Sequence, residues 1–400
     1  MNRNSVSDWT KWWADDIPCH FSPDQAIENA AYLSELLGSR FLTGTNHPIG
    51  EVKHPILQRW KTRGAGAFLE LNALASDLRV VSGVDGFAAV LEDLKNSNTC
   101  LATWHTIHSA ALLGRAPGVK IVQFFPQTDE PLPDFSVAHE GQTVMCEAKL
   151  LAKSGQEEVF DLYASHLLER INTGVTTEKC IHPSITVVLK SVHSLPPVDD
   201  VVRVVAEGLT RYSNRPLVYR TGTFNVFLDS SQSLVSNVTE SRSCFLLCPK
   251  SEKEDLRVHS RGAKASRQLT SKAAADHPGL FFLSITYLQD SRHVANLFRK
   301  RFDIGQYSGI AGLVLIQSGT HLEPPVRAPI DLIATVRNSR SIRPHPNLTF
   351  QTVGLAGRFP SNLREEIPAY RHLSHEIRVG DGFAGVVVPD IKALKREMLE

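Results

Sequence analysis

Residues 119–150 contain three short runs in which apolar and polar side chains alternate, and this pattern constrains the fold more than any other part of the chain. The runs are 119–125, 134–138 and 142–150, and a helical pattern at 100–113 precedes them. The last two runs flank Glu140-Gly141, a pair suited to a two-residue hairpin turn. The sequence therefore predicts a helix followed by a three-stranded meander.

A turn at Glu140-Gly141 also fixes the register of the hairpin, and it places Asp134 opposite Glu147. Opposed side chains point to the same face of a sheet, and Lys149 shares that face because side chains alternate along a strand. The other face is entirely apolar, with Phe135, Val137, Val144, Cys146 and Ala148. We expect two carboxylates and an ammonium on the solvent side of a hairpin whose reverse side lies in the core.

The two opposed carboxylates repel each other unless a cation or a shared proton relieves the repulsion. Hard oxygen ligands in small number favour Mg²⁺ over zinc, with Mn²⁺ as a substitute. Asp134 and Glu147 are therefore the expected metal ligands. In such a site the metal polarises a phosphate and acidifies a bound water, while Lys149 orients that water or stabilises the developing charge.

Pro133-Asp134 and Glu147-Ala148-Lys149, preceded by a helix and a strand, resemble the signature of the PD-(D/E)XK nuclease superfamily. The resemblance implies an α/β fold with a restriction-endonuclease-like core, a mixed central sheet flanked by helices. It implies a metal-dependent nuclease that hydrolyses phosphodiester bonds. DNA is preferred over RNA as the substrate because DNA is the more common substrate in the superfamily. The alternative is a catalytically inactive nucleic-acid-binding or protein-interaction module on the same fold.

Members of this superfamily carry a further helix and a fourth core strand, and two segments compete for that place. The near pair is a helix at 157–171 with a strand at 184–190, and its polar residues are mostly acidic. The far pair is a helix at 260–275 with a strand at 280–286, where Lys264 and Gln268 share a helical face with Arg261 and Lys272. We favour the far pair, which makes Lys264 and Gln268 auxiliary catalytic residues.

The sequence departs from the superfamily in the helix at 100–113, where many members place a metal-binding glutamate. The inward candidates are His105, Thr106 and His108, and the helix contains no acid. Three alternatives stay open: a distant acid such as Glu70 or Glu92, one of the histidines, or a site that works with two carboxylates.

These assignments divide the chain into four regions. They are a helical N-terminal region at 1–85, a nuclease core at 86–152 and 256–318, a large α/β insertion at 153–255 and a C-terminal β-rich extension at 319–400. The N-terminal region contains a capping box at 22–25 that begins a helix over 23–37. Short strands are expected near 331–336, 349–356 and 383–388.

Bulk composition constrains partners only weakly. The formal net charge is +1, so nucleic-acid binding would depend on local basic stretches such as 257–272 and 337–343, which are otherwise solvated surface. The longest apolar window, 309–316, is far shorter than the roughly 20 residues of a membrane helix. The expectation is a cytoplasmic protein that binds DNA and no membrane, with a homodimer or protein partner at the N-terminal helices left open.

Overall fold

The computed structural model describes the chain in fourteen segments, which form two compact units. The described residues are 19–43, 54–61, 64–125, 131–151, 154–174, 183–191, 193–213, 215–229, 242–248, 253–285, 291–321, 326–357, 377–379 and 383–388. Unit 1 comprises Met1–Leu151, Arg257–Ile285 and Ser291–Phe359, and unit 2 comprises Ala152–Leu256, Thr286–Asp290 and Pro360–Glu400.

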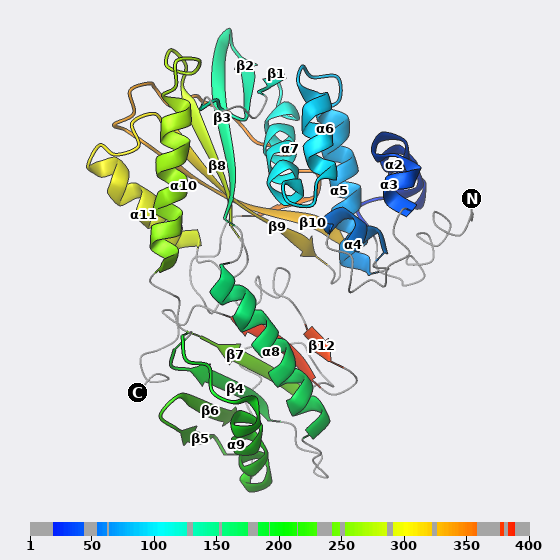
Figure 1. Ribbon diagram of the computed structural model, residues 1–400, viewed down its shortest axis with the longest axis vertical. Coiled ribbons are helices and arrows are strands. Elements are labelled where there is room, and N and C mark those ends of the chain that lie inside the picture. Colours follow the sequence, from blue (N-terminus) through cyan, green and yellow to red (C-terminus); the bar gives the residue numbers. More distant parts are fainter. Residues whose placement is uncertain are drawn as a thin grey trace. The chain divides into compact units, whose positions relative to one another are not determined.

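Unit 1 is built around a mixed seven-stranded sheet with the order β1-β2-β3-β8-β9-β10-β11 (Figure 1). The strands are β1 Val119–Phe124, β2 Phe135–His139, β3 Gln142–Leu151, β8 Gly279–Ile285, β9 Gly312–His321, β10 Ala328–Arg337 and β11 Leu355–Gly357. Strands β1, β2 and β3 are mutually antiparallel, β3, β8 and β9 are parallel, β9 and β10 are antiparallel, and β11 is parallel to β10. The predicted α/β class is confirmed.

The hairpin between β2 and β3 has the register that its turn residues predict. Phe135 pairs with Cys146 and Val137 with Val144. Glu140 and Gly141 both have positive φ, 48° and 77°, as a two-residue turn that matches strand twist requires. This register places Asp134, the residue before β2, opposite Glu147.

Strand β3 continues the sheet through a partner that lies far along the chain. Glu147 of β3 pairs with Phe281 of β8 in a parallel register. Helix α10, Lys253–Leu269, leads into β8. The far helix and strand therefore adjoin the hairpin in space, whereas β4, Ser184–Leu189, of the near pair belongs to the sheet of unit 2.

Helices cover both faces of the unit 1 sheet (Figure 1). Helices α2 to α7 build the core on one face, where Cys146 and Ala148 of β3 point. Helices α10 and α11 build the core on the other face, with Met145 and Leu151 of β3. Their bounds are α2 Pro23–Leu37, α3 Ser39–Thr43, α4 Pro55–Lys61, α5 Ala65–Val81, α6 Phe87–Lys95, α7 Cys100–Gly114 and α11 Ser291–Asp303. The expectation that the second face of the hairpin is open to solvent is wrong, because β3 lies inside the sheet and α10 packs over it.

Unit 2 has a six-stranded mixed sheet with the order β12-β13-β7-β4-β6-β5. Helices α8, Gly155–Gly174, and α9, Val198–Arg211, share one apolar core with this sheet. The remaining strands are β5 Leu217–Arg220, β6 Phe224–Asp229, β7 Arg242–Leu247, β12 Ile377–Val379 and β13 Phe383–Val388. Unit 2 holds 152–256, one residue more at each end than the predicted insertion.

Several predicted boundaries differ from the structure. Helix α10 begins at Lys253 and ends at Leu269, not 260–275, because Val258 continues its apolar face and turns follow from Ser271. The strand predicted at 349–356 is only β11, Leu355–Gly357, and the region at 1–85 shares its core with α7 rather than forming a separate part. The predicted extension at 319–400 begins inside β9, and β10 and β11 continue the same sheet.

Two further observations concern the cysteines and the hydropathy of the helices. The five cysteines among the described residues are free thiols. Within the segments that the structure describes, no helix has the length and hydropathy needed to cross a bilayer.

A buried charge network joins the helices to the sheet in unit 1. His108 of α7 contacts Asp77 Oδ2 of α5 through Nδ1 at 2.8 Å, and Asp331 Oδ1 of β10 through Nε2 at 3.1 Å. Arg115 donates to Asp77, and Ser318 Oγ of β9 donates to Asp331 Oδ1 at 2.7 Å. Burial works against a charged His108, but the two aspartates outweigh it and raise its pKa to about 10. This histidine is therefore a cation that binds three elements together.

We predict that His108→Gln lowers the free energy of unfolding by ~3–5 kcal/mol at neutral pH, because it leaves two buried carboxylates without their shared cation. The folded pKa of His108 is about 10 against an ordinary value of 6.5. Its contribution is therefore complete below pH 6.5 and is lost as pH rises toward 10. Denaturant titrations of both proteins across this range test the prediction, which a pH-independent difference between them would contradict.

Candidate active site

Asp134 is held against β3 by three contacts. Its backbone N–H donates to the carbonyl of Cys146 at 3.0 Å, and its Oδ2 accepts from the backbone N–H of Ala148 at 2.8 Å. The same Oδ2 lies 3.3 Å from Nζ of Lys149. The side chain is largely buried, so the hairpin fixes the direction of this carboxylate.

Glu147 lies next to this carboxylate and is completely buried. Its Oε1 forms a direct ion pair with Lys149 Nζ. Its Oε2 has no hydrogen-bond donor among the described residues. Burial raises the pKa of Glu147 well above its usual range, Asp134 raises it further, and the charge of Lys149 offsets only part of the effect. A buried carboxylate oxygen without a donor is costly, so this position favours a bound cation.

Lys149 contributes the positive charge to the group formed by Asp134, Glu147 and Lys149. Burial acts to lower its pKa, but Asp134 and Glu147 outweigh burial and raise the pKa above the usual value. Lys149 is therefore charged at neutral pH. With two carboxylates and one ammonium, the group has an excess of negative charge when both acids are ionised.

Helix α10 contributes two side chains to the same face. Gln268 Nε2 donates to the carbonyl of Leu132 at 2.8 Å, beside the segment that carries Asp134. Its Oε1 is buried and has no partner among the described residues. Lys264 lies one turn earlier and is close enough for its charge to lower the pKa of Glu147. Both residues that the sequence placed on this helix thus lie beside the acidic group.

The candidates for a third metal ligand have other partners, although His105 is close enough to Lys149 for that charge to lower its pKa. Burial lowers the pKa of His105 to about 3, and its ring contacts Ser109. His108 is engaged by two aspartates, and Glu70 forms an ion pair with Arg59.

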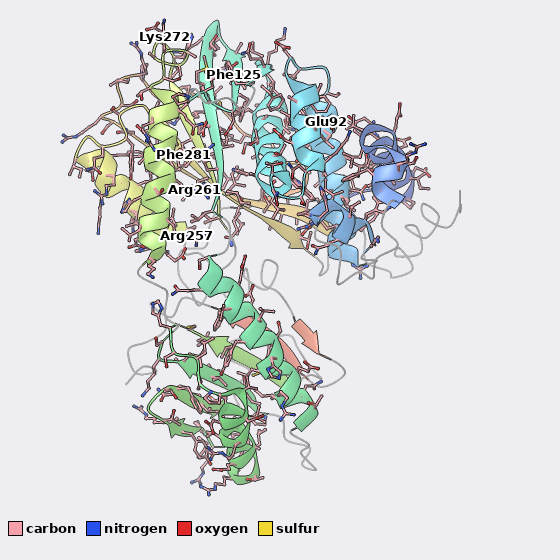
Figure 2. The ribbon with its side chains drawn as sticks, viewed as in Figure 1. Glu92, Phe125, Arg257, Arg261, Lys272 and Phe281 are labelled. Carbon is pink, nitrogen blue, oxygen red and sulfur yellow. The ribbon has the colours of Figure 1, made fainter. Side chains whose placement is uncertain are left out.

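Two further candidates are also engaged away from the acidic group. Glu92 is exposed on α6 and pairs with Lys95 (Figure 2). Thr106 donates back to its own helix at Ala102. Within the described segments, no three His, Cys, Asp or Glu side chains converge to hold a metal.

Of the five sequence-predicted site residues, the structure brings Asp134, Glu147 and Lys149 into contact. Lys264 is close enough to influence Glu147, and Gln268 contacts the backbone two residues before Asp134. Sequence reasoning missed the backbone N–H of Ala148 and the carbonyl of Leu132, which orient two of them. It also missed the network around His108. The sequence feature that could have indicated this network is Asp77, a single acid among the apolar positions Leu74, Leu78 and Val81 of α5.

Comparisons of the chain with protein-family models, with characterised proteins and with solved structures found no match. Function is therefore inferred from the geometry and charge of the site.

We predict that Lys149→Met destabilises the metal-free protein far more than Glu147→Gln does. Lys149→Met leaves two neighbouring buried carboxylates without their cation and is expected to cost ~3–5 kcal/mol of unfolding free energy. Glu147→Gln removes the repulsion between the acids and is expected to cost less than about 1 kcal/mol or to stabilise. Urea denaturation in EDTA measures both values, and equal destabilisation by the two variants would contradict this account.

Proposed function

We propose that this protein is a metal-dependent nuclease of the PD-(D/E)XK type that hydrolyses phosphodiester bonds in DNA. One observation carries the proposal. Asp134, Glu147 and Lys149 converge on one face of β3, and a buried oxygen of Glu147 has no donor among the described residues. Two acids and a lysine at this spacing match the catalytic set that the superfamily resemblance implies.

The order of elements in unit 1 supports the proposal. The chain passes from α7 through the meander β1-β2-β3, leaves for unit 2, and returns through α10 to β8, which pairs with β3. A helix, three strands, a helix and a fourth strand beside the third is the arrangement expected from the resemblance.

The donor set fits Mg²⁺. Asp134 and Glu147 would hold the ion through carboxylate oxygens, and Mg²⁺ commonly uses one or two carboxylates with waters and phosphate oxygens as its other ligands. When bound, the ion would polarise the phosphate and lower the pKa of a bound water. Mn²⁺ has the same oxygen preference and would substitute.

The remaining side chains have roles that follow from their positions. Lys149 is charged and lies between the acids, so it can orient the attacking water by hydrogen bonding and stabilise charge on the phosphate. Lys264 brings a second positive charge to the group. Gln268 Oε1 has no partner among the described residues and can accept a hydrogen bond from a water, while the amide nitrogen donates to the carbonyl of Leu132.

Incubation of the purified protein with supercoiled plasmid, and separately with RNA, tests the proposal. We expect nicking or linearisation of the plasmid in Mg²⁺ or Mn²⁺ and none in EDTA. Asp134→Asn and Lys149→Met are each expected to lower the rate at least ~100-fold, since each removes charge at the reacting phosphate.

Glu140→Gln is the matched control for these variants. Glu140 is an exposed acid at the turn of the same hairpin, and its side chain lies outside the group. It should leave the rate unchanged. Metal-independent cleavage, or full activity of Asp134→Asn, would contradict the proposed function, and faster cleavage of RNA would contradict the assignment to DNA.

A further inference from the structure

Positive charge is concentrated in one short segment of an otherwise balanced chain. Between Leu256 and Ala275 there are five basic residues and no acid, while the whole chain has 43 basic and 42 acidic residues. The five are Arg257, Arg261, Lys264, Arg267 and Lys272. This segment is α10 after its first turn, which contains Glu254 and Asp255, together with the turn that follows the helix.

Helical geometry places this charge on the side of α10 that faces away from its core. Val258, Ala265 and Leu269 are buried against the sheet. Arg261 and Lys264 flank that buried stripe at the spacing of neighbours on one face. Lys264 and Arg267 are exposed, and Arg261 is half-buried. Among the described residues, no acidic side chain forms an ion pair with Arg261, Arg267 or Lys272.

The basic side chains run past the candidate active site rather than away from it. Lys264 is electrostatically coupled to Glu147, and Gln268 is hydrogen-bonded to Leu132. Arg261 precedes these contacts along the helix, and Lys272 follows them. Figure 2 shows Arg261 midway along α10 and Lys272 beyond the end of this helix.

The turn that carries Lys272 is held in place. Its backbone N–H groups bond back in sequence, from Ser271 to Gln268 and from Ala274 to Ser271. Arg343 donates to the carbonyl of Ala275 through Nε at 3.2 Å and through a terminal nitrogen at 3.0 Å. Lys272 therefore projects from an ordered support, as a preorganised binding surface requires.

We propose that Arg261, Lys264, Arg267 and Lys272, which we call the α10 stripe, bind the sugar-phosphate backbone of a nucleic-acid duplex. This inference rests on the proposed function, and it assigns the surface along which the substrate lies. From Arg261 to the end of α10 at Leu269 the helix rises by about 12 Å, the length of three to four base pairs, and Lys272 lies in the turn beyond. The phosphate beside Lys264 and Gln268 is then the one presented to Asp134 and Glu147.

A duplex fits the stripe better than a single strand. Proteins that bind single strands combine a basic groove with aromatic side chains on which bases stack. Helix α10 contains no Phe, Tyr or Trp. The stripe offers charge without a stacking surface, which suits contact with phosphates and leaves the bases paired.

Binding in EDTA tests the stripe separately from catalysis. The probe is a fluorescent DNA duplex of about 20 base pairs, longer than the stripe at ~3.4 Å per pair. Anisotropy titrations at several salt concentrations give the slope of log K against log salt. Arg261→Gln and Lys272→Gln are each expected to weaken binding several-fold and to reduce the slope by about 1.

Arg40→Gln is the control, because Arg40 is an exposed arginine on α3, which packs on the other face of the sheet. It should leave affinity and slope unchanged, and all variants should keep the wild-type melting temperature. Unchanged slopes for both stripe variants, or equal loss with Arg40→Gln, would overturn the inference, as would tighter binding of the single strand. Weaker binding by the stripe variants without any plasmid cleavage would support this surface while the proposed nuclease activity failed.

Discussion

The physical constraint on which this structure depends is the burial of charged side chains on β3, a strand that is covered by helices on both faces. Glu147 and Lys149 lie on β3 between the apolar residues Met145 and Leu151, under α10. Removing each ion from water costs several kcal/mol, and a well-packed apolar pair of similar volume is often at least as stable. The acids and the lysine therefore weaken the core that surrounds them. A chemical role explains their presence better than stability does.

The two charge networks of unit 1 show what such a role looks like. Around His108, both ring nitrogens contact carboxylates, Arg115 supports Asp77, and Ser318 supports Asp331. That network pairs both ring nitrogens of His108 and holds helices to strands, although one terminal nitrogen of Arg115 has no partner among the described residues. Around Glu147, one carboxylate oxygen has no donor among the described residues. The histidine in the first network is held on both sides by carboxylates, whereas the carboxylate in the second keeps an oxygen without a donor, as the proposed cation site requires.

The local part of the site followed from strand geometry. A turn with positive φ at Glu140 and Gly141 fixes the hairpin register, and alternation along the strand then fixes which side chains share a face. The partner of β3 was harder to identify, because more than a hundred residues separate the two paired strands. The basic composition of α10 favoured the correct segment, since a cationic helix complements an acidic face.

By itself, the sequence determined the α/β class, the hairpin and the convergence of Asp134 with Glu147, because these depend on contacts between residues close along the chain. Only the tertiary structure decided that this face is buried and that His108 is a structural cation. Both depend on segments that pack from distant positions: α10 over β3, and Asp331 against α7. Burial sets the cost of a charge, and no periodicity within one element reveals what will cover it.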